Sequence, residues 1–363
     1  MTATVTKAGP YYSSGSISFS SLRSNFKESA SGSISASELR RNTTTTDTKP
    51  VVPDATENAS VSTSSNLALS QFRNTIKYYY ITQTDTNTNF DIDAQTWNSN
   101  LNKNIRKWMY INGTCGSNSS SSSAVDFNST AYNLTIDVSG IIYGAGGTGG
   151  TSATISGGNG GNALSITNSS GSNLIVNVQS TAKIYGGGGG GEKGLKGADG
   201  SSGTCVIAQD FVSGCQQGGN SCPGGWNQVA SGNWCCSWNR GCAANYWYKR
   251  CERTYAVSGG IGGEGGNGGP GRGYNNQSGA LAGADGALGT SAGTCTSGGT
   301  YRITPGNGLK GENGGIGGEW AKSGGNTNNT GNGGSPGKAI TGSNYTVTGT
   351  VDSTTIIGSY NPS

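Results

Sequence analysis

Glycine at every third position is the feature that most limits how this chain can fold. It falls at 259, 262, 265, 268 and 271, and the same spacing recurs over 191–203, 283–289 and 308–317. A period of three matches the polyproline-II geometry, whereas an α-helix needs about 3.6 residues per turn and a strand needs about two. The runs therefore predict extended helices that pair their backbone groups laterally, since buried unpaired backbone groups are costly.

Two other glycine-rich structures fit this pattern less well. Collagen-like chains carry roughly 15–20% proline, whereas this chain has 8 Pro among 363 residues. A flexible linker remains an alternative, although linkers favour Gly and Ser without a period, and these runs carry Ile, Leu, Glu and Lys between the glycines. We predict a bundle of packed polyglycine-II helices with long loops, formed by residues 144–150, 157–163, 186–203, 259–273, 279–289, 306–318 and 324–337.

Composition restricts both the stability and the function of the chain. Hydrophobic residues make up only 31%, against about 45–50% in ordinary domains, so disulfides and lateral hydrogen bonds must contribute to the stability of the fold.

A net charge of +4 from scattered basic residues argues against nucleic-acid binding, and no apolar run is long enough for membrane insertion. Residues 1–20 lack the pattern of a secretory signal. The absence of His removes the commonest general base and metal ligand, so we expect no metal and no cofactor.

Residues 16–75 contain a degenerate repeat with the copies SISFSSLR (16–23), SISASELR (33–40) and NLALSQFR (66–73). A Ser in each copy is expected to cap a short helical turn. Copies this small bury little by themselves, so we expect each to sit on a partner or a symmetry mate. A disordered Ser/Thr-rich arm is the alternative.

These copies resemble small repeats at the N-termini of tailed-bacteriophage virion proteins. The resemblance implies an extended arm that attaches the chain to other phage tail or fibre proteins. The residues that it assigns to virion attachment are Ile17, Phe19, Leu22, Arg23, Ile34, Leu39, Arg40, Leu67, Leu69, Phe72 and Arg73.

The rest of the chain reads as mostly irregular and β. We divide it into the repeat arm (1–75), a small β-rich connector (76–116), a Ser-rich linker (117–130) and a glycine-rich domain (131–363). In the connector, Lys103, Arg106 and Lys107 are expected to form a solvated basic face. Residues 132–150, 172–191 and 344–362 each begin with alternating apolar positions, which predicts a β cap at the base of the bundle.

This plan resembles the receptor-recognising adhesins at the tips of the long tail fibres of T-even-like phages. Over residues 130–363, glycine runs alternate with variable segments as in that family. The resemblance implies a polyglycine-II sandwich on the virion tail, whose variable loops bind the host surface. A position on the fibre tip and a position on the baseplate both stay open.

The insert 204–258 interrupts the glycine pattern and holds seven Cys. The matching contexts SSGTC and SAGTC favour a disulfide between Cys205 and Cys295. The other candidates, Cys215, Cys222, Cys235, Cys236, Cys242 and Cys251, would pair in one of fifteen connectivities, and Cys115 is left over. Zinc is the competing interpretation, but the chain has neither a Cys-x-x-Cys pair nor a His.

Exposed Trp, Tyr and Arg dominate binding hot spots, so this insert is where we expect receptor binding. The candidates are Trp226, Trp234, Trp238, Tyr246, Trp247, Tyr248, Arg250 and Arg253, with Tyr274, Tyr301 and Arg302 in other loops. Several of these Trp would instead form a small core between the disulfides. We expect a non-enzymatic adhesin for a host protein or glycan. A structural tail or baseplate component with the bundle as a rigid spacer is the alternative, and a carboxylate-based depolymerase is disfavoured.

Overall fold

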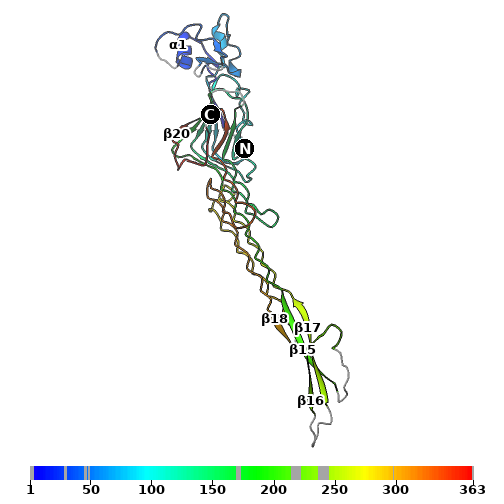
Figure 1. The fold of residues 1–363 in the computed structure, drawn as a ribbon. Helices are drawn as coiled ribbons and strands as arrows, with labels where there is room; N and C mark the ends of the chain where they lie inside the picture. Colours follow the sequence, from blue (N-terminus) through cyan, green and yellow to red (C-terminus); the bar gives the residue numbers. More distant parts are fainter. Residues whose placement is uncertain are drawn as a thin grey trace. The chain divides into compact units, whose positions relative to one another are not determined.

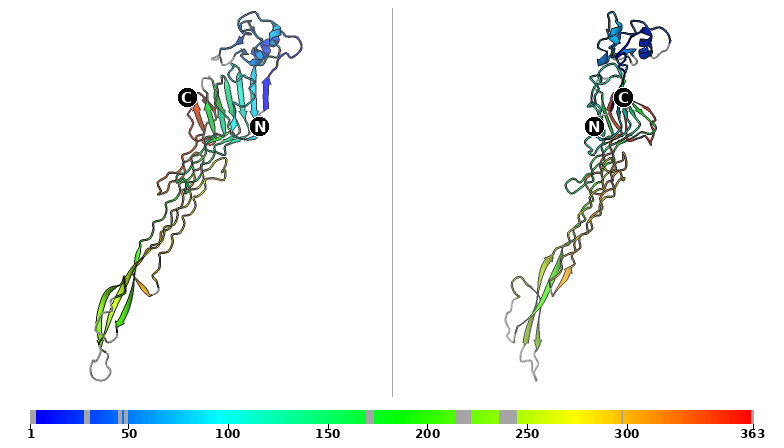
Figure 2. Two further views of the ribbon diagram at one scale, coloured as in Figure 1. Left: turned by 90° about the vertical axis from the view of Figure 1, so that its right-hand side faces the viewer. Right: turned by 180° about the vertical axis from the view of Figure 1, so that it is seen from behind.

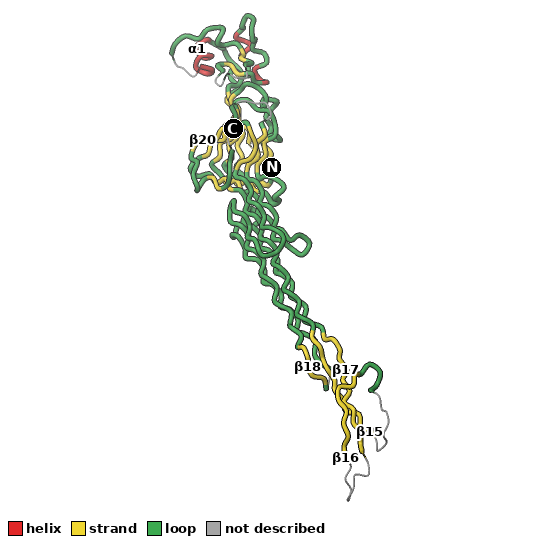
Figure 3. The backbone as a smooth tube through the Cα atoms, viewed as in Figure 1, coloured by secondary structure: helices red, strands yellow, loops and turns green. Residues whose placement is uncertain are grey.

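Two compact units make up the chain, and strands and irregular segments dominate both. A computed structural model describes residues 4–27, 31–44, 47, 50–168, 173–213, 222–235, 245–296 and 298–361. The first unit comprises Met1–Lys193, Gly268–Gly283 and Gly315–Ser363, and the second comprises Gly194–Asn267 and Ala284–Gly314. The short helices of the described residues all lie within 19–72 (red in Figure 3). The expected class, mostly β and irregular, is confirmed.

Three sheets hold most strands of the first unit. The first sheet joins, in order, β1 (Thr4–Ala8), β4 (Tyr78–Gln83), β7 (Arg106–Ile111), β10 (Leu134–Val138), β13 (Ile175–Val178) and β20 (Thr346–Gly349), with β1 antiparallel and the rest parallel. The second, all parallel, joins β21 (Ile356–Ile357), β14 (Lys183–Tyr185), β11 (Ile141–Tyr143), β8 (Thr114–Gly116) and β5 (Thr86–Thr88). The third, also parallel, joins β19 (Ile340–Ser343), β12 (Leu164–Thr167), β9 (Val125–Phe127) and β6 (Phe90–Asp91).

Successive stretches of chain give one strand to each sheet in turn, which makes a three-sided parallel β-solenoid. β4, β5 and β6 form one coil, β7 to β9 the next, and β10 to β12 the third. β13, β14 and β19 complete a fourth coil, and β20 and β21 follow. Figure 2 shows strands of the first sheet side by side.

The solenoid differs from the separate connector, linker and cap that the sequence indicates. Residues 117–130 do not separate two sheets, because β9 lies among them and pairs with β6 and β12. Only the Ser-rich part of this stretch is a corner, and Val125 and Phe127 beyond it are fully buried. The coils cannot be recognised in the sequence, because each parallel strand pairs only with strands that lie one coil away.

A ladder of apolar side chains fills the interior beneath the first sheet. Ile81 is paired with Met109, Met109 with Ile136, and Ile136 with Val176, and all four are fully buried. Burying a side chain of this size stabilises a protein by about 1.5–3 kcal/mol. The solenoid thus obtains a continuous core from a chain that is poor in hydrophobic residues.

Asparagines turn the chain into successive strands of the first sheet. Asn133, Asn173 and Asn344 adopt φ values of 51°, 56° and 61°, which Asn tolerates better than most residues. The side chains of Asn133 and Asn173 also stack, since the Asn173 amide donates to the Asn133 side chain at 3.2 Å and that of Asn133 donates to Asn104. The recurring Asn before an apolar residue is therefore the sequence mark of one solenoid corner.

Two glycine-rich runs, 144–150 and 157–163, lie between β11 and β12, and the others lie between β14 and β19. The runs are joined by backbone hydrogen bonds at every third residue. In the second unit, the N–H groups of Gly194, Gly197 and Gly200 donate to the carbonyls of Gly266, Gly263 and Gly260 at 2.7–2.8 Å. Figure 1 shows these runs lying side by side. A period of three in the sequence thus becomes a period of three in the lateral bonds.

Close approach of backbones explains why these positions hold glycine. A Cβ atom built on Gly190 would lie 1.8 Å from the carbonyl oxygen of Thr148, and one on Gly265 would lie 1.9 Å from that of Gly194. Real Cβ contacts are never this short, and the obstructing atoms belong to backbone. Any side chain here would push two runs apart.

The N-terminal repeats form a compact body instead of an extended arm. Its elements are α1 (Phe19–Leu22), the π-helical turn Arg23–Lys27, the 3₁₀ turns η2 (Thr56–Asn58) and η3 (Leu69–Phe72), and the strands β2 (Arg41–Asn42) and β3 (Val52–Pro53). Its core consists of Leu22, Phe26, Leu39, Val52, Val61 and Phe72, each at most 1% exposed. The repeats therefore pack on one another within one chain, which separate copies in the sequence do not reveal.

Lys107 corrects the expectation of a solvated basic face. Its side chain is fully buried and donates to the backbone carbonyls of Lys103 and Ile105 at 2.8 and 2.9 Å. Burial lowers the pKa of Lys107 to about 7.

In the helices that the structure describes, no segment is long and apolar enough to cross a membrane.

Replacing Gly190 by Ala should strongly destabilise the glycine-rich runs, because the new methyl group would overlap the Thr148 carbonyl. We expect the free energy of unfolding to fall by about 3 kcal/mol or more, which is at or above the upper end of the costs measured for overpacked cores. Gly224→Ala is the matched control, since a Cβ there meets nothing within 4 Å. Thermal unfolding of both variants checks this, and equal melting temperatures would contradict it.

Buried Lys107 predicts a stability that rises with pH. Between its folded pKa near 7 and an unfolded value of about 10.4, the unfolded state binds the proton that the folded state lacks. The free energy of unfolding should therefore increase from pH 7 to 9.5, with a slope of up to about 1.4 kcal/mol per pH unit. Lys107→Met should remove this part of the slope in urea titrations; identical slopes would refute the assignment.

Candidate functional site

The insert that the sequence indicates as a loop is mostly an antiparallel sheet. The sheet consists of β15 (Gly203–Ser213), β16 (Asn227–Cys235) and β17 (Asn245–Val257) from the insert and of β18 (Gly299–Ile303) from outside it, in the order β16-β17-β15-β18. β15 and β17 pair without interruption from Gly203↔Val257 to Ser213↔Trp247, and β16 pairs with the other edge of β17. All four strands belong to the second unit.

Two disulfides tie this sheet together. Cys205 in β15 is bonded to Cys295 with a Cα–Cα distance of 5.8 Å, so the expected pair is present. Cys222 is bonded to Cys251 of β17, also with 5.8 Å between Cα atoms. Cys205 and Cys251 are fully buried. The structure thus selects one of the pairings that the sequence left open.

The remaining cysteines fall into two groups. Cys215, Cys236 and Cys242 lie outside the described residues, as does the side chain of Cys235. Cys115 in β8 is a buried free thiol, and burial raises its pKa to about 12. It is therefore an inert part of the solenoid core, because the reactive thiolate hardly forms.

Tyrosine hydroxyls hold the segment around Cys295 against the sheet. Tyr255 and Tyr301 both lie opposite Cys205, on the two neighbouring strands. The Tyr301 hydroxyl accepts from the Cys295 N–H and donates to the Gly293 carbonyl, each at 3.1 Å, and the Tyr255 hydroxyl accepts from the Thr296 N–H. Tyr301, expected as a binding residue, has its hydroxyl committed to this contact while 42% of the residue stays exposed.

Three arginines of the candidate set are exposed on this sheet. Arg250 and Arg253 extend from β17, and Arg302 extends from β18. Across the β15–β17 pair, Arg250 lies opposite Asp210 and Arg253 lies opposite Ile207. The sheet therefore presents separated positive charges, and Arg250 and Arg253 lie on opposite faces because they are three residues apart in one strand.

The aromatic candidates, unlike the arginines, lie both in strands and before them. Trp226 is half-buried before β16, and its backbone N–H donates to the Pro223 carbonyl. Trp234 lies opposite Tyr246 in the β16–β17 pairing, and Trp247 and Tyr248 follow in β17. The side chains of these four strand residues, and Trp238 entirely, lie outside the described residues.

Tyr274 belongs to the first unit, apart from the other candidates. Its ring covers Gly116 of β8 so closely that a Cβ there would overlap the ring. Its backbone N–H donates to the Gly144 carbonyl. Tyr274 therefore packs the end of the glycine run 259–273 onto the solenoid, and a pattern of loop aromatics cannot distinguish this role from binding.

A second aromatic group was missed by sequence reasoning. Tyr143 of β11 and Tyr185 of β14 stack at 5.3 Å between ring centroids, and Trp320 lies 4.5 Å from Tyr143. Arg272 lies over the Trp320 ring and forms an ion pair with Glu319 at 2.9 Å. The Ile-Tyr sequence that ends both strands is the only signal that could have indicated this group.

The carboxylates of the described residues include one group, Asp91, Asp93 and Asp126, whose charges interact. Burial raises the pKa values of Asp93 and Asp126, while hydrogen bonds from Arg272 and Ala280 lower that of Glu319. The first two accept hydrogen bonds on the outside of the third sheet, and Glu319 is an exposed ion-pair partner. Within the part of the chain that the structure describes, no group of acidic or Cys side chains could hold a metal ion.

Comparison with known proteins gives a family match over more than half of the chain. The family model of the phage tail fibre adhesin Gp38 matches residues 76–286. The crystal structure of the gp37–gp38 adhesin tip complex of the bacteriophage S16 long tail fibre is similar at 17% identity and a TM-score of 0.35, over 82% of this chain and 88% of that chain. No curated protein matches the chain.

Removing the Cys205–Cys295 disulfide should destabilise the antiparallel sheet. The bond closes a separation of 90 residues, and loss of a native disulfide typically costs about 2–5 kcal/mol. We expect the double variant Cys205→Ala/Cys295→Ala to melt at a lower temperature than the wild type in buffer without reductant. Reductant should lower the wild-type melting temperature in the same direction, and unchanged melting of the variant would contradict the assignment.

Proposed function

Because the chain belongs to the phage tail fibre adhesin Gp38 family, it is a receptor-binding adhesin of the virion tail, and we propose that its antiparallel sheet carries the receptor-binding surface. The support is the combination of two disulfides with exposed Arg250, Arg253 and Arg302 on one small sheet. A cross-linked sheet loses little conformational entropy on binding, which favours affinity. Arginine is also enriched at binding hot spots.

The positive charge of these positions favours a receptor that offers anionic or carbonyl groups. Guanidinium groups bind carboxylates and phosphates in a bidentate manner. Trp226, Trp234, Trp238 and the Tyr246–Tyr248 stretch would add stacking surfaces for sugar rings or apolar side chains. Host surface glycans and acidic loops of outer-surface proteins both meet this description.

We propose that the glycine-rich runs are polyglycine-II helices that serve as a rigid mount for the sheet. The support is the bonding of Gly194, Gly197 and Gly200 at intervals of three residues. A spacer role alone, with recognition elsewhere, is the alternative. A spacer role alone does not explain why the insert holds disulfides and exposed arginines.

We further propose that the N-terminal body, residues 1–75, attaches the chain to another phage tail or fibre protein. The repeated turns support this, and the similar bacteriophage S16 protein is described in complex with the fibre protein gp37. Within this division of labour, the proposed adhesin part includes residues 76–130 as well as 131–363, because β4 to β9 belong to the same solenoid as the later strands. We expect the chain to act by binding, without catalysis.

Charge reversal on β17 tests the binding surface. We expect Arg250→Glu/Arg253→Glu to weaken binding of the purified chain to host cells at least tenfold, because both exposed cations would become anions. Lys196→Glu/Lys310→Glu is the matched control, with the same charge change at exposed positions of the glycine runs. Flow cytometry with labelled protein provides the measurement.

The outcomes separate the two proposed roles. Loss of host-cell binding in the β17 variant alone supports the antiparallel sheet as the binding surface. Equal binding by both variants would refute it and favour the spacer. Protease-treated and periodate-treated cells then distinguish a protein receptor from a glycan.

A further inference from the structure

Four half-buried aromatic residues lie next to one another on the outer face of the first sheet, namely Tyr78 and Tyr80 of β4 and Trp108 and Tyr110 of β7. The centroid of the Trp108 ring lies 5.7 Å from that of Tyr78 and 5.4 Å from that of Tyr80. The Tyr80 and Tyr110 centroids are 6.3 Å apart. The residues that alternate with these four in both strands are buried in the solenoid. We call the four residues the outer aromatic face.

The later coils show that the solenoid can be built without aromatic residues on this face. The position of Tyr110 is occupied by Asp137 in β10 and by Asn177 in β13. That of Trp108 is occupied by Thr135 in β10. The strands β10 and β13 nevertheless pair in parallel and contribute to the same buried apolar ladder. The four aromatic rings therefore add a surface that the fold itself does not require.

A row of polar side chains borders the outer aromatic face. Asp137 lies directly opposite Tyr110 in the next strand. Its carboxylate accepts hydrogen bonds from the Asn177 amide at 2.8 Å and from the Gln179 amide at 3.1 Å. The Thr348 hydroxyl donates to the Asn177 side chain at 3.2 Å. Carboxylates and amides have more than one hydrogen-bonding position each, so this polar row can also bind the hydroxyl groups of a ligand.

The charged groups beside the outer aromatic face interact with their neighbours. The Arg106 guanidinium lies 4.2 Å from the centroid of the Tyr78 ring and donates to the Tyr78 hydroxyl. Asp137 accepts from two amides. A nucleic acid or an anionic membrane surface would instead require a cluster of Lys and Arg, and an added peptide strand would require an open sheet edge. β4 and β7 offer no such edge, because each is paired on both sides.

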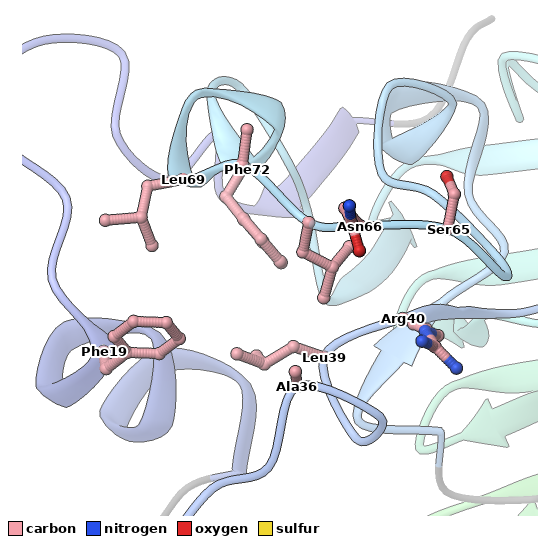
Figure 4. Close-up of a pocket in the computed structure, with 10 residues that line it drawn as sticks. Phe19, Ala36, Leu39, Arg40, Ser65, Asn66, Leu69 and Phe72 are labelled. Atoms are coloured by element: carbon pink, nitrogen blue, oxygen red, sulfur yellow. The ribbon is translucent and has the colours of Figure 1, made fainter.

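The outer aromatic face is distinct from the apolar surface of the N-terminal body. There, Phe19, Leu39 and Leu69 line a pocket of about 280 Å³ (Figure 4). That pocket lies in the part of the chain to which we assign attachment, and it contains none of the four aromatic residues. Attachment through the N-terminal body and binding at the outer aromatic face therefore do not compete for the same residues.

We propose that the outer aromatic face and the polar row beside it bind an uncharged polysaccharide of the host surface. A sugar ring has C–H groups on its faces and hydroxyl groups at its rim, so it can stack on the electron-rich face of an aromatic ring while its hydroxyls bind planar polar side chains. Neighbouring strands are about 4.7–4.9 Å apart, so a sugar chain that crosses β4, β7 and β10 meets the rings first and then Asp137. This site lies in the first unit, so the inference goes beyond the proposed receptor-binding sheet of the second unit and does not depend on it.

Binding of the purified full chain to an array of immobilised bacterial surface polysaccharides, uncharged and anionic, tests this site. We expect binding to uncharged polysaccharides to weaken at least about tenfold in Tyr80→Ala/Trp108→Ala, because two stacking surfaces are removed. Thr86→Ala/Thr88→Ala is the matched control, since it shortens two exposed residues of β5 in the same coil and should bind like the wild type. Absence of wild-type binding, binding to anionic polysaccharides alone, or equal binding by the aromatic variant would overturn the proposal.

A second variant separates loss of the site from loss of the fold. Asp137→Ala leaves all four rings in place, and it should weaken polysaccharide binding about threefold or more while the melting temperature stays unchanged. Unchanged polysaccharide binding by this variant would refute the role of the polar row.

Two further measurements locate the site and exclude a second copy of the chain as the occupant. Arg250→Glu/Arg253→Glu should bind the polysaccharide like the wild type, and loss in this variant instead of the aromatic variant would place the site on the antiparallel sheet and overturn the inference. Sedimentation velocity should give the same monomer for the wild type and for Tyr80→Ala/Trp108→Ala. A wild-type dimer that the aromatic substitutions dissociate would identify a second copy as the occupant and refute the polysaccharide site.

Discussion

Backbone hydrogen bonding between neighbouring stretches of chain is the interaction on which both units depend. With 31% hydrophobic residues, the chain cannot rely on a large apolar core. Each lateral bond adds only about 0.5–1.5 kcal/mol net, so order requires many of them in register. The solenoid obtains register from stacked coils, and the glycine runs obtain it from their period of three.

The solenoid and the glycine-rich runs are packed in opposite ways. Inside the solenoid, residues such as Ile81 and Ile136 are fully buried. Between the glycine runs there is no room for side chains, so the larger residues of each run are displaced outward. Ile261 and Leu288 are accordingly 61% and 79% exposed. Exposed aliphatic residues on these runs are therefore a geometric consequence of the close backbone contact, and need no binding partner to explain them.

The sequence predicted those features that depend on local spacing. Glycine periodicity indicated lateral packing, and matched SSGTC and SAGTC contexts indicated Cys205–Cys295. Short turns in the repeats were also expected, but with Ser20, Ser37 and Ser70 as caps, whereas the caps are Ser18, Ser35 and Ala68. Features that depend on contacts one coil apart could not be predicted this way. β9 was hidden beside a Ser-rich corner, Lys107 was expected in solvent, and the long insert was expected to be a loop instead of a sheet. The composition of the insert was thus enough to locate the candidate site. The hydrogen bond between the Tyr301 hydroxyl and the Cys295 N–H, however, could be found only from the fold.

The entry and exit of the glycine-rich runs between β14 and β19 lie side by side. β14 ends at Tyr185, β19 begins at Ile340, and the Gly337 N–H donates to the Gly187 carbonyl at 2.8 Å. Lengthening a closed loop costs little, so the two end points by themselves permit segments of different length. A segment exchanged between these points must nevertheless also supply a donor to the Gly147 carbonyl and a ring over Gly116, as Gly271 and Tyr274 do here.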